Sequence, residues 1–324
     1  MTIVRAFIAL AAIVLPAIGS VSAVAQDSTT RTIKIIVGFG AGGGTDLAAR
    51  IVAQPLQEIL GQPVVVENKP SAGGILGGDQ VAKGPKDGSS LLMMSNAHAV
   101  SAAMYKTLPY DPVKDFQMLS QVGTAGLVMI AAPDFPAGDA KGVMALLKAD
   151  PNKYNYGSAG VGTTQQFAAE LFNQMAGVKI THIPYRSTPA VVAGLLSKDT
   201  HYAFELIQIV SGQIRGGTLK AIAVTSPQRY PSLSEVPTFA ETGLPGYDVT
   251  SWYGLSMAAG TPKPIVDRIN KALVEALGRE SVREQILKVG AQPRSSTPEE
   301  LSRHIESEIA KWRGVREKAG IPQL

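Results

Sequence analysis

The sequence of 324 residues contains no cysteine. This absence excludes disulfide bonds, thiolate metal sites, a cysteine nucleophile and a lipid anchor on an N-terminal cysteine. Charged residues make up only 17% of the chain and aromatic residues 6%, so a charge-driven filament or coiled coil is not expected. The 30 basic and 26 acidic residues are spread along the chain, without the basic face of a nucleic-acid binder. We therefore expect no nucleic-acid partner.

Long hydrophobic runs are also missing after the first 25 residues, which have a distinct character. Arg5 is followed by an apolar stretch over 6–18 and then by Ala23-Val24-Ala25. A positive start, a short hydrophobic region and a small-residue cleavage site are typical of a secretory signal peptide; a buried first helix is the alternative. We expect residues 1–25 to be removed and the protein to be exported to a bacterial periplasm. The remainder is long enough for two domains.

Short β-branched runs alternate with helical stretches from residue 31 onward. This β-α-β rhythm predicts parallel strands joined by helical crossovers, and hence an α/β class. We expect a discontinuous first domain at 26–124 and 252–324 and a second at 125–251, with a Pro- and Gly-rich ordered loop over 227–247. Strands are predicted at 33–37, 64–66, 91–94, 127–131, 154–156, 180–183, 202–204 and 221–224. Helices are predicted at 45–60, from the loop 71–74 to residue 82, and at 140–149, 165–176, 190–196, 265–277, 281–289 and 298–319.

Two glycine-rich loops, 38–46 and 157–164, each follow a predicted strand and open a predicted helix. Free N–H groups and the positive end of a helix dipole together attract anions. One such loop is more often an ordinary tight turn, but two, one in each domain, predict a cleft that holds a small anion. Asp46 is either a contact in this cleft or only a helix cap.

The first loop also supports a different hypothesis. Gly38-x-Gly40-x-x-Gly43 matches the dinucleotide-binding fingerprint, and Glu67 ends the second strand. The alternative function is therefore an NAD(P)-dependent oxidoreductase. The export signal and Asp46, which would oppose a pyrophosphate, rank this hypothesis second. The four histidines show no metal-ligand spacing, and Gly-Ser158-Ala-Gly lacks the register of a nucleophile elbow.

Several ordered segments resemble the Bug family, the periplasmic receptors of tripartite tricarboxylate transporters. The resemblance runs from about residue 33 to 322. It is carried by Val37-x-Phe39-x-x-Gly42-Gly43-x-Thr45-Asp46, Val66-Glu67-Asn68-Lys69-Pro70, Tyr156-Gly157-Ser158-x-Gly160-x-Gly162-Thr163, His182-Ile183-Pro184-Tyr185 and Pro237-Thr238-x-x-Glu241-x-Gly243.

The resemblance implies a two-lobed periplasmic binding protein of type II-like architecture, in which mostly parallel sheets flanked by helices meet at a hinge. Such a receptor closes on a small carboxylate for transport or sensing and performs no chemistry, so no cofactor and no metal are expected. We expect a monomer whose partners are the membrane components of a transporter or a sensor. The predicted ligand contacts are Phe39, Gly42, Thr45, Asp46, Asn96, His98, Ser158, Gly162, Thr163 and Glu205.

The chain departs from the family pattern at three places. Gly38 and Gly40 replace the usual Pro or Ala, which predicts a more mobile loop. Ser187-Thr188 stands where the family usually has a glycine-rich segment, and Glu205 stands where the family usually has Asp. The longer side chain of Glu205 predicts a shortened or reshaped ligand pocket.

Overall fold

The computed structural model describes residues 31–324. The signal peptide predicted at 1–25 lies outside these residues. Within the described part of the chain, no helix combines the length and the apolar character needed to cross a membrane.

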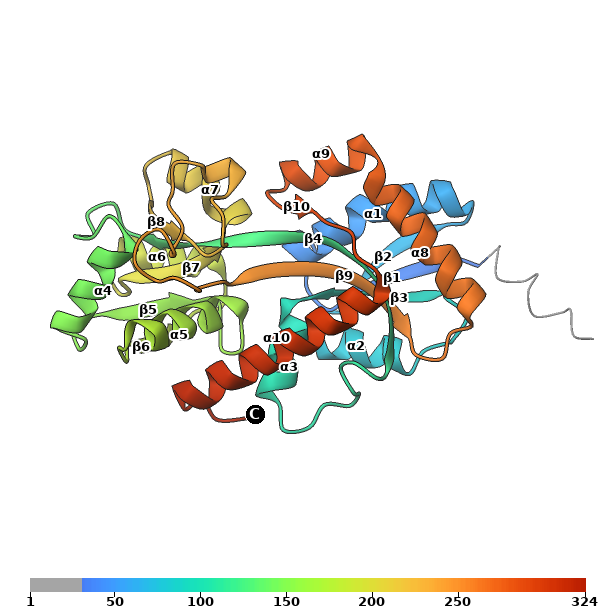
Figure 1. The fold of residues 1–324 in the computed structure, drawn as a ribbon, viewed down its shortest axis with the longest axis horizontal. Helices are drawn as coiled ribbons and strands as arrows, with labels where there is room; N and C mark the ends of the chain where they lie inside the picture. The colour runs from blue at the N-terminus through green and yellow to red at the C-terminus, as the bar shows by residue number, and fades with distance from the viewer. Residues whose placement is uncertain (1–30) are drawn as a thin grey trace, which may run out of the picture.

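The first half of the molecule is built on three parallel strands, β1 (Ile33–Val37), β2 (Val64–Asn68) and β3 (Ser90–Ser95). β1 lies between the other two. The three strands run parallel because helical segments connect them and return the chain to the same end of the sheet. These elements occupy the right of Figure 1. The connecting segments are α1 (Gly44–Leu60), the short turn η1 (Ala72–Gly74), α2 (Ile75–Ala82) and α3 (Asn96–Met104).

The second half repeats this design on the left of Figure 1. β5 (Asn155–Ser158) pairs in parallel with β6 (Thr181–Pro184) and β7 (Tyr202–Leu206). Its buried residues include a cluster of rings, among them Phe172, Phe204 and Phe239. The remaining elements are α4 (Ala140–Ala149), α5 (Thr164–Ala176), α6 (Thr188–Leu196), α7 (Ile207–Arg215), β8 (Lys220–Val224) and the turn η2 (Pro231–Leu233).

Two long strands join the halves. β4 (Phe116–Ala131) pairs with β9 (Thr250–Ala258) as far as Gly126, and from Leu127 onward it pairs with β7 and β8. The resulting β4–β9 ribbon crosses the middle of the molecule (Figure 1). The chain ends with α8 (Lys263–Gly278), α9 (Glu280–Lys288), β10 (Gln292–Pro293) and α10 (Pro298–Ala319).

The predicted two-lobed α/β class is confirmed, with one refinement of the sheets. The predicted parallel strands β1–β3 and β5–β7 are present, but β4 and β9 run antiparallel to their neighbours. The helix predicted at 298–319 has those bounds, because Thr297 and Glu300 form a capping box at its start and Gly320 ends it with a left-handed φ of 67°.

Several elements were predicted only in part or not at all, among them the first eleven residues of β4 and the whole of β9, β10, α3 and α7. The first eleven residues of β4 contain Ser120, Gln121 and Gly123, and its register shifts twice, so no clean period of two marks the strand. α3 and α7 begin directly at strand ends, at Asn96 and Ile207, without a capping side chain. Asn96 and His98, which the sequence places after the third strand, therefore lie on the first turn of α3.

Candidate functional site

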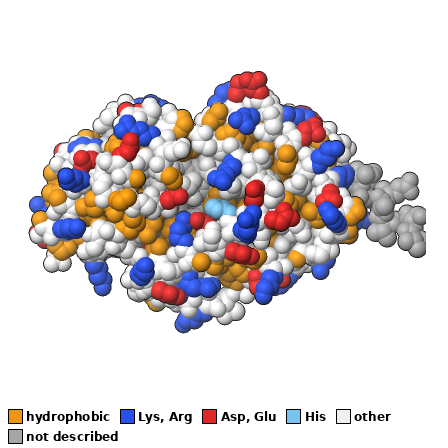
Figure 2. Space-filling view, viewed as in Figure 1, with side chains coloured by type: hydrophobic (Ala, Val, Ile, Leu, Met, Phe, Trp, Pro, Cys, Tyr) orange, Lys and Arg blue, Asp and Glu red, His pale blue; other side chains and the backbone are white. Residues whose placement is uncertain are grey.

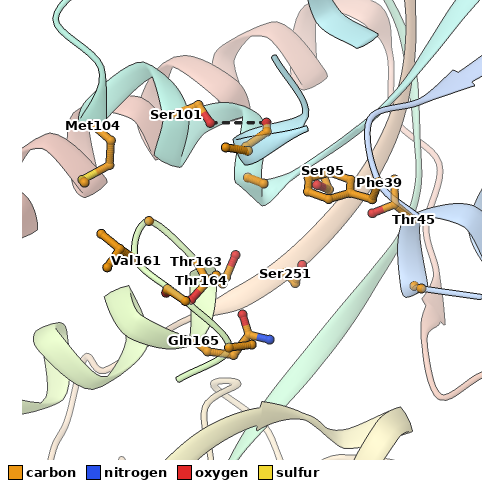
Figure 3. A pocket seen from close by; sticks show the side chains of 18 of the residues that line it. Phe39, Thr45, Ser95, Ser101, Met104, Val161, Thr163, Thr164, Gln165 and Ser251 are labelled. Carbon is orange, nitrogen blue, oxygen red and sulfur yellow. Dashed lines mark hydrogen bonds between the residues drawn. The ribbon is translucent and has the colours of Figure 1, made fainter. Parts of the chain in front are cut away.

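A cavity of about 450 Å³ lies between the two halves, on one face of the β4–β9 ribbon. Figure 3 shows Phe39 and Thr45 on one side of this cleft and Val161, Thr163, Thr164 and Gln165 across from them. The start of α3 and residues Ala72 and Gly73 close one end, and Ser251 and Tyr253 of β9 form the floor. Both glycine-rich loops therefore reach one cavity.

In the first loop, Gly42 adopts a φ of 82°, a conformation that a side chain would strain. Its N–H donates to Oδ2 of Asp46 over 2.8 Å, which closes the loop onto the start of α1. No side chain caps α1 at Gly43. Among the described residues, the N–H groups of Gly44 and Thr45 therefore have no hydrogen-bond acceptor.

The second loop has the same form. Gly162 has a φ of 78°, and its N–H donates to Oε1 of Gln166 over 2.8 Å. The hydroxyl of Thr163 caps α5 by accepting from the N–H of Gln166. The N–H groups of Thr164 and Gln165 have no acceptor among the described residues. Two helix starts with free N–H groups thus open into the cleft.

The cleft carries no charged side chain among the described residues that line it. The lining includes apolar side chains from both halves, Phe39 and Met104 from the first and Val161, Leu206 and Ile209 from the second. The polar groups of the lining residues include hydroxyls, the amide of Gln165 and backbone N–H groups. An anion in this cleft would be held by hydrogen bonds and helix dipoles and would also contact hydrocarbon.

Six of the predicted contacts do not line the cavity, and Asp46 is one of them. It is 1% exposed. Burial alone would raise the pKa of Asp46, but hydrogen bonds from Arg50, Gly42 and Asn68 outweigh it and hold the pKa below its ordinary value. The ionised carboxylate of Asp46 holds the first loop in place by accepting from the N–H of Gly42. Gly42 itself was a predicted contact and does not line the cavity either.

Asn96 and His98 lie on α3, behind the cavity wall that Ser95 and Ala97 form. The amide of Asn96 donates to Thr164 Oγ1 over 3.2 Å and accepts from the indole of Trp312 over 2.9 Å. It therefore links the two halves. The ring of His98 stacks on Tyr110, and burial lowers the pKa of His98 to about 4. A packing role accounts for this histidine.

Ser158 is fully buried, and its neighbours Ala159 and Gly160 line the cavity instead. Its Oγ lies 2.7 Å from Nε2 of His182, a contact that the sequence did not predict. Burial lowers the pKa of His182 to about 4, so its ring is neutral at pH 7, and the hydroxyl of Ser158 also donates to the carbonyl of Gly160 over 3.0 Å. The same hydroxyl accepts from the N–H of Gly160, and the pair supports the second loop.

Glu205 is also fully buried, one layer behind the cleft. Its Oε2 accepts from Thr188 Oγ1 over 3.0 Å and from Gln165 Nε2 over 3.4 Å, while Oε1 has no partner. Burial raises the pKa of Glu205 to about 7, although these hydrogen bonds lower it in part. Glu205 thus orients Gln165, which does line the cavity.

Several lining residues were not among the contacts predicted from the sequence. Ser251 and Tyr253 alternate with Thr250 and Trp252 along β9, a period of two that gives no sign of which face is the cleft. Gly44 was predicted only as part of the loop. A Cβ at Gly44 would lie 2.2 Å from the Tyr253 hydroxyl, so a larger residue would displace the Tyr253 side chain.

The dinucleotide fingerprint has a local structural cause. A Cβ at Gly38 would lie 2.5 Å from Cα of Gly74, so this glycine allows the first loop to pack against η1. Gly40, by contrast, has open space around its missing side chain. Packing within the first half therefore explains the first glycine of the motif without a nucleotide.

A two-lobed fold with a cleft between its halves defines the class of periplasmic binding proteins. The model of the tripartite tricarboxylate transporter family receptor matches residues 48–321. The chain therefore belongs to this receptor family, and the resemblance to Bug proteins is confirmed. Among curated relatives, Protein BugT of Bordetella pertussis is 34% identical over 292 residues, which cover 90% of each chain.

Solved structures agree with this assignment. The periplasmic binding protein BugD is 33% identical with a TM-score of 0.79, over 91% of this chain and 99% of that chain. A protein of R. palustris with adipate is 31% identical with a TM-score of 0.81, over 91% and 99%. MatC from Rhodopseudomonas palustris with bound malate is 30% identical with a TM-score of 0.77, over 88% and 98%. These comparisons support the assignment to a family of periplasmic receptors and give no support to the oxidoreductase alternative.

Proposed function

We propose that this protein is a periplasmic receptor that binds a small carboxylate in the cleft and performs no chemistry on it. The observation that carries the proposal is the pair of helix starts, α1 and α5, that present free N–H groups to one cavity without a charged side chain in its lining. A carboxylate satisfies these donors, and about four hydrogen bonds of 1.5–3 kcal/mol each are enough for micromolar binding.

The ligand we propose has a short, partly apolar body beside its carboxylate. Phe39, Val161 and Ile209 supply hydrocarbon on the walls, and the cavity of about 450 Å³ suits a molecule of that size. Adipate and malate, which occupy two related structures, are therefore the first ligands to test. Phe39, Thr45, Gly162 and Thr163 remain our proposed contacts from the sequence, and Gln165 joins them.

Binding is proposed to close the two lobes about the β4–β9 ribbon. The change in β4 pairing between Gly126 and Leu127 supports lobes at 26–124 with 252–324 and at 125–251. Export by a cleaved signal peptide, a monomeric state and delivery to membrane components of a transporter or to a sensor complete the proposal.

Calorimetric titration of the purified mature protein with adipate and malate tests this function. We expect micromolar binding of at least one of them, no binding of the matching diamide, and no heat with NAD or NADP. Nucleotide binding without carboxylate binding would favour the oxidoreductase. Mass spectrometry of molecules released from freshly purified, denatured protein then identifies the natural ligand.

Gln166→Glu provides a sharper test of the helix-start mechanism. The new carboxylate would accept from the N–H of Gly162 and place a negative charge at the start of α5, which weakens carboxylate binding about tenfold. Gln285→Glu on the exposed face of α9 adds the same charge at a remote place and should leave binding unchanged. Equal effects of both variants would contradict the mechanism.

A further inference from the structure

The β4–β9 ribbon has a second cavity on its opposite face. Thr250 and Trp252 line this cavity, whereas Ser251 and Tyr253 line the cleft. Successive side chains of a strand point to opposite faces of a sheet. The ribbon therefore separates the cleft from a cavity of about 600 Å³, which we name the hinge cavity.

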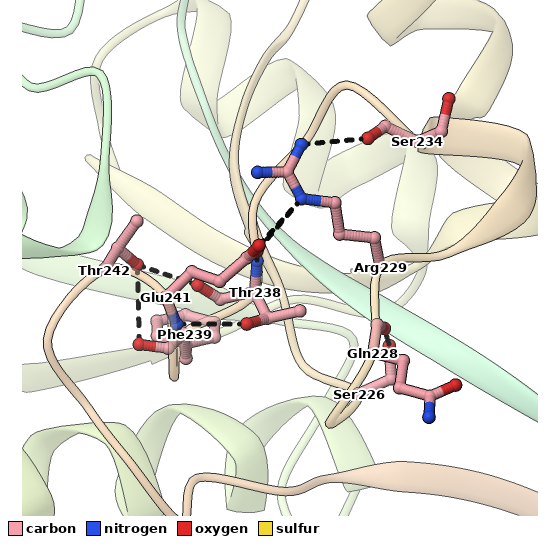
Figure 4. Close-up of polar contacts among 8 residues, drawn as sticks. All are labelled: Ser226, Gln228, Arg229, Ser234, Thr238, Phe239, Glu241 and Thr242. Carbon is pink, nitrogen blue, oxygen red and sulfur yellow. Dashed lines mark hydrogen bonds and ion pairs between the residues drawn. The ribbon is translucent and has the colours of Figure 1, made fainter.

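Both halves of the molecule contribute walls to the hinge cavity. Residues 226–231 come from the second half, and β10 and α10 contribute Gln292, His304 and Lys311 from the other side. Figure 4 shows how the first wall is braced: Arg229 donates to both oxygens of Glu241 at 3.0 Å and to the carbonyl of Ser234. The shape of this cavity thus depends on the relative position of the halves.

Two buried ring nitrogens at this cavity have no partner among the described residues. The indole of Trp252 has no exposed surface, and its Nε1 donates to nothing. Nε2 of His304, whose ring lies 5.3 Å from that of Trp252, is likewise unpaired. Buried polar groups are almost always paired in proteins. Because an indole can only donate, its missing partner is an acceptor.

The charges around the hinge cavity also leave a cation without a partner. Lys311 pairs with Glu308 and Arg229 pairs with Glu241, whereas Asp248, which also lines the cavity, forms no ion pair with a described residue and accepts a hydrogen bond from Thr250. Arg294 makes no side-chain hydrogen bond or ion pair with a described residue. Figure 2 shows basic and acidic side chains mixed over this face, so the unpaired guanidinium is a local feature and not part of a broad basic patch.

We propose that the hinge cavity is a second binding site, for a small anion whose carboxylate or phosphate group is held by Arg294 and the indole N–H of Trp252. Bending that narrows the cleft widens the hinge cavity, because they lie on opposite faces of one ribbon. An anion that contacts both walls therefore opposes closure and weakens binding in the cleft, and the two ligands affect each other equally. The coupling rests on the proposed function of the cleft, whereas the second binding site does not.

The two tryptophans of the chain allow a direct test. In protein labelled with ¹⁵N on the indole, Trp252 and Trp312 give two resonances, which Trp312→Phe assigns. Citrate is expected to shift the Trp252 resonance, and Arg294→Gln is expected to weaken this binding about tenfold, as the loss of one hydrogen bond to a charged group does. Arg283→Gln, which removes the same charge from exposed α9, should bind citrate as the wild type does.

Inorganic phosphate provides a second arm. Tighter binding of citrate identifies a carboxylate site, and tighter binding of phosphate identifies a phosphate site. The proposal is overturned if neither anion shifts the Trp252 resonance, if Arg294→Gln binds normally, or if both arginine variants lose affinity equally. If citrate bound only in the cleft, Arg294→Gln would bind it normally.

Adipate titrations with and without saturating citrate test the coupling. We expect a severalfold loss of adipate affinity in the wild type and none in Arg294→Gln. Unchanged adipate affinity in the wild type would contradict the coupling. Failure of adipate to bind at all would count against the proposed function and leave the citrate result standing.

Discussion

The loops before α1 and α5 share a backbone but differ in chemistry. In each, a glycine with a φ near 80° donates its N–H to a side chain four residues later, over 2.8 Å in both cases. The acceptor is the carboxylate of Asp46 in the first loop and the neutral amide of Gln166 in the second. The comparison shows that this loop geometry needs an acceptor at that position, whatever its charge.

A buried carboxylate near the ligand site needs several hydrogen-bond donors to remain ionised. The carboxylate of Asp46 is held by Arg50 and Asn68 as well as by Gly42. Glu205, the buried acid of the second half, keeps one oxygen unpaired. The pKa of Asp46 is lowered and that of Glu205 is raised to about 7. Two buried carboxylates near one cleft therefore affect stability in opposite directions as pH changes.

The largest expected effect separates the two loop acceptors. Asp46→Ala leaves three donors without their acceptor and should lower the free energy of unfolding by about 4 kcal/mol. Gln166→Ala removes the acceptor of one N–H group, that of Gly162, and should cost about 1 kcal/mol. Urea denaturation measures both. Asp267→Ala, which breaks an exposed pair with Lys263, is the control and should change stability by less than about 0.5 kcal/mol. Equal losses of stability in Asp46→Ala and Gln166→Ala would contradict the expected difference between the two acceptors.

The next effect concerns pH. The pKa of Glu205 is raised in the folded protein from 4.5 to about 7, so the folded state retains a proton that the unfolded state loses. Stability from this group is present below pH 4.5 and is lost as pH rises through about 7, by at most about 3 kcal/mol. Wild type should therefore lose stability relative to Glu205→Gln between pH 4.5 and 8 in thermal melts. Parallel profiles would contradict this assignment.

Strain at the two equivalent glycines should be similar. Gly42→Ala and Gly162→Ala meet no atom within 4 Å of the new Cβ, but both place a side chain at positive φ, which costs about 1–2 kcal/mol. Gly212→Ala in α7 also has open space and no positive φ, and should be neutral or stabilising. Chemical denaturation of the three variants measures the difference. A large difference between the two loop variants would show that their geometries are not equivalent.

The smallest expected effect is at the cap that only the second loop has. Thr163→Ala removes the acceptor for the N–H of Gln166 and should cost about 1 kcal/mol in stability. Thr163→Ser retains the hydroxyl and should recover most of this loss. If Thr163→Ser does not recover stability, the loss in Thr163→Ala comes from the methyl group of Thr163 and not from its cap.

Much of the architecture could be predicted from the sequence. α10 was predicted because Thr297, Glu300 and Gly320 mark its ends by local chemistry. β4 could not be predicted in full, since its first half gains its partners from β9, more than a hundred residues away. α3 contains small residues and Asn96 at its start, which gave no helical stripe.

The candidate site divides in the same way. The two glycine-rich loops were identified because positive φ and helix starts have local sequence signals. His98 and Ser158 looked equally available at strand ends, yet packing places the first against Tyr110 and buries the second beside His182. Local sequence does not reveal which of two adjacent residues faces a cavity.

By itself, the sequence determined the α/β class, the family and the two anion-attracting helix starts, because each depends on residues close together in the chain. Only the tertiary structure decided that both starts face one cleft, that Asp46 and Glu205 stand behind its wall, and that Trp252 faces a different cavity. These outcomes depend on the antiparallel pairing of β4 with β9, which brings distant segments together and sets which side chains lie on each face of the ribbon.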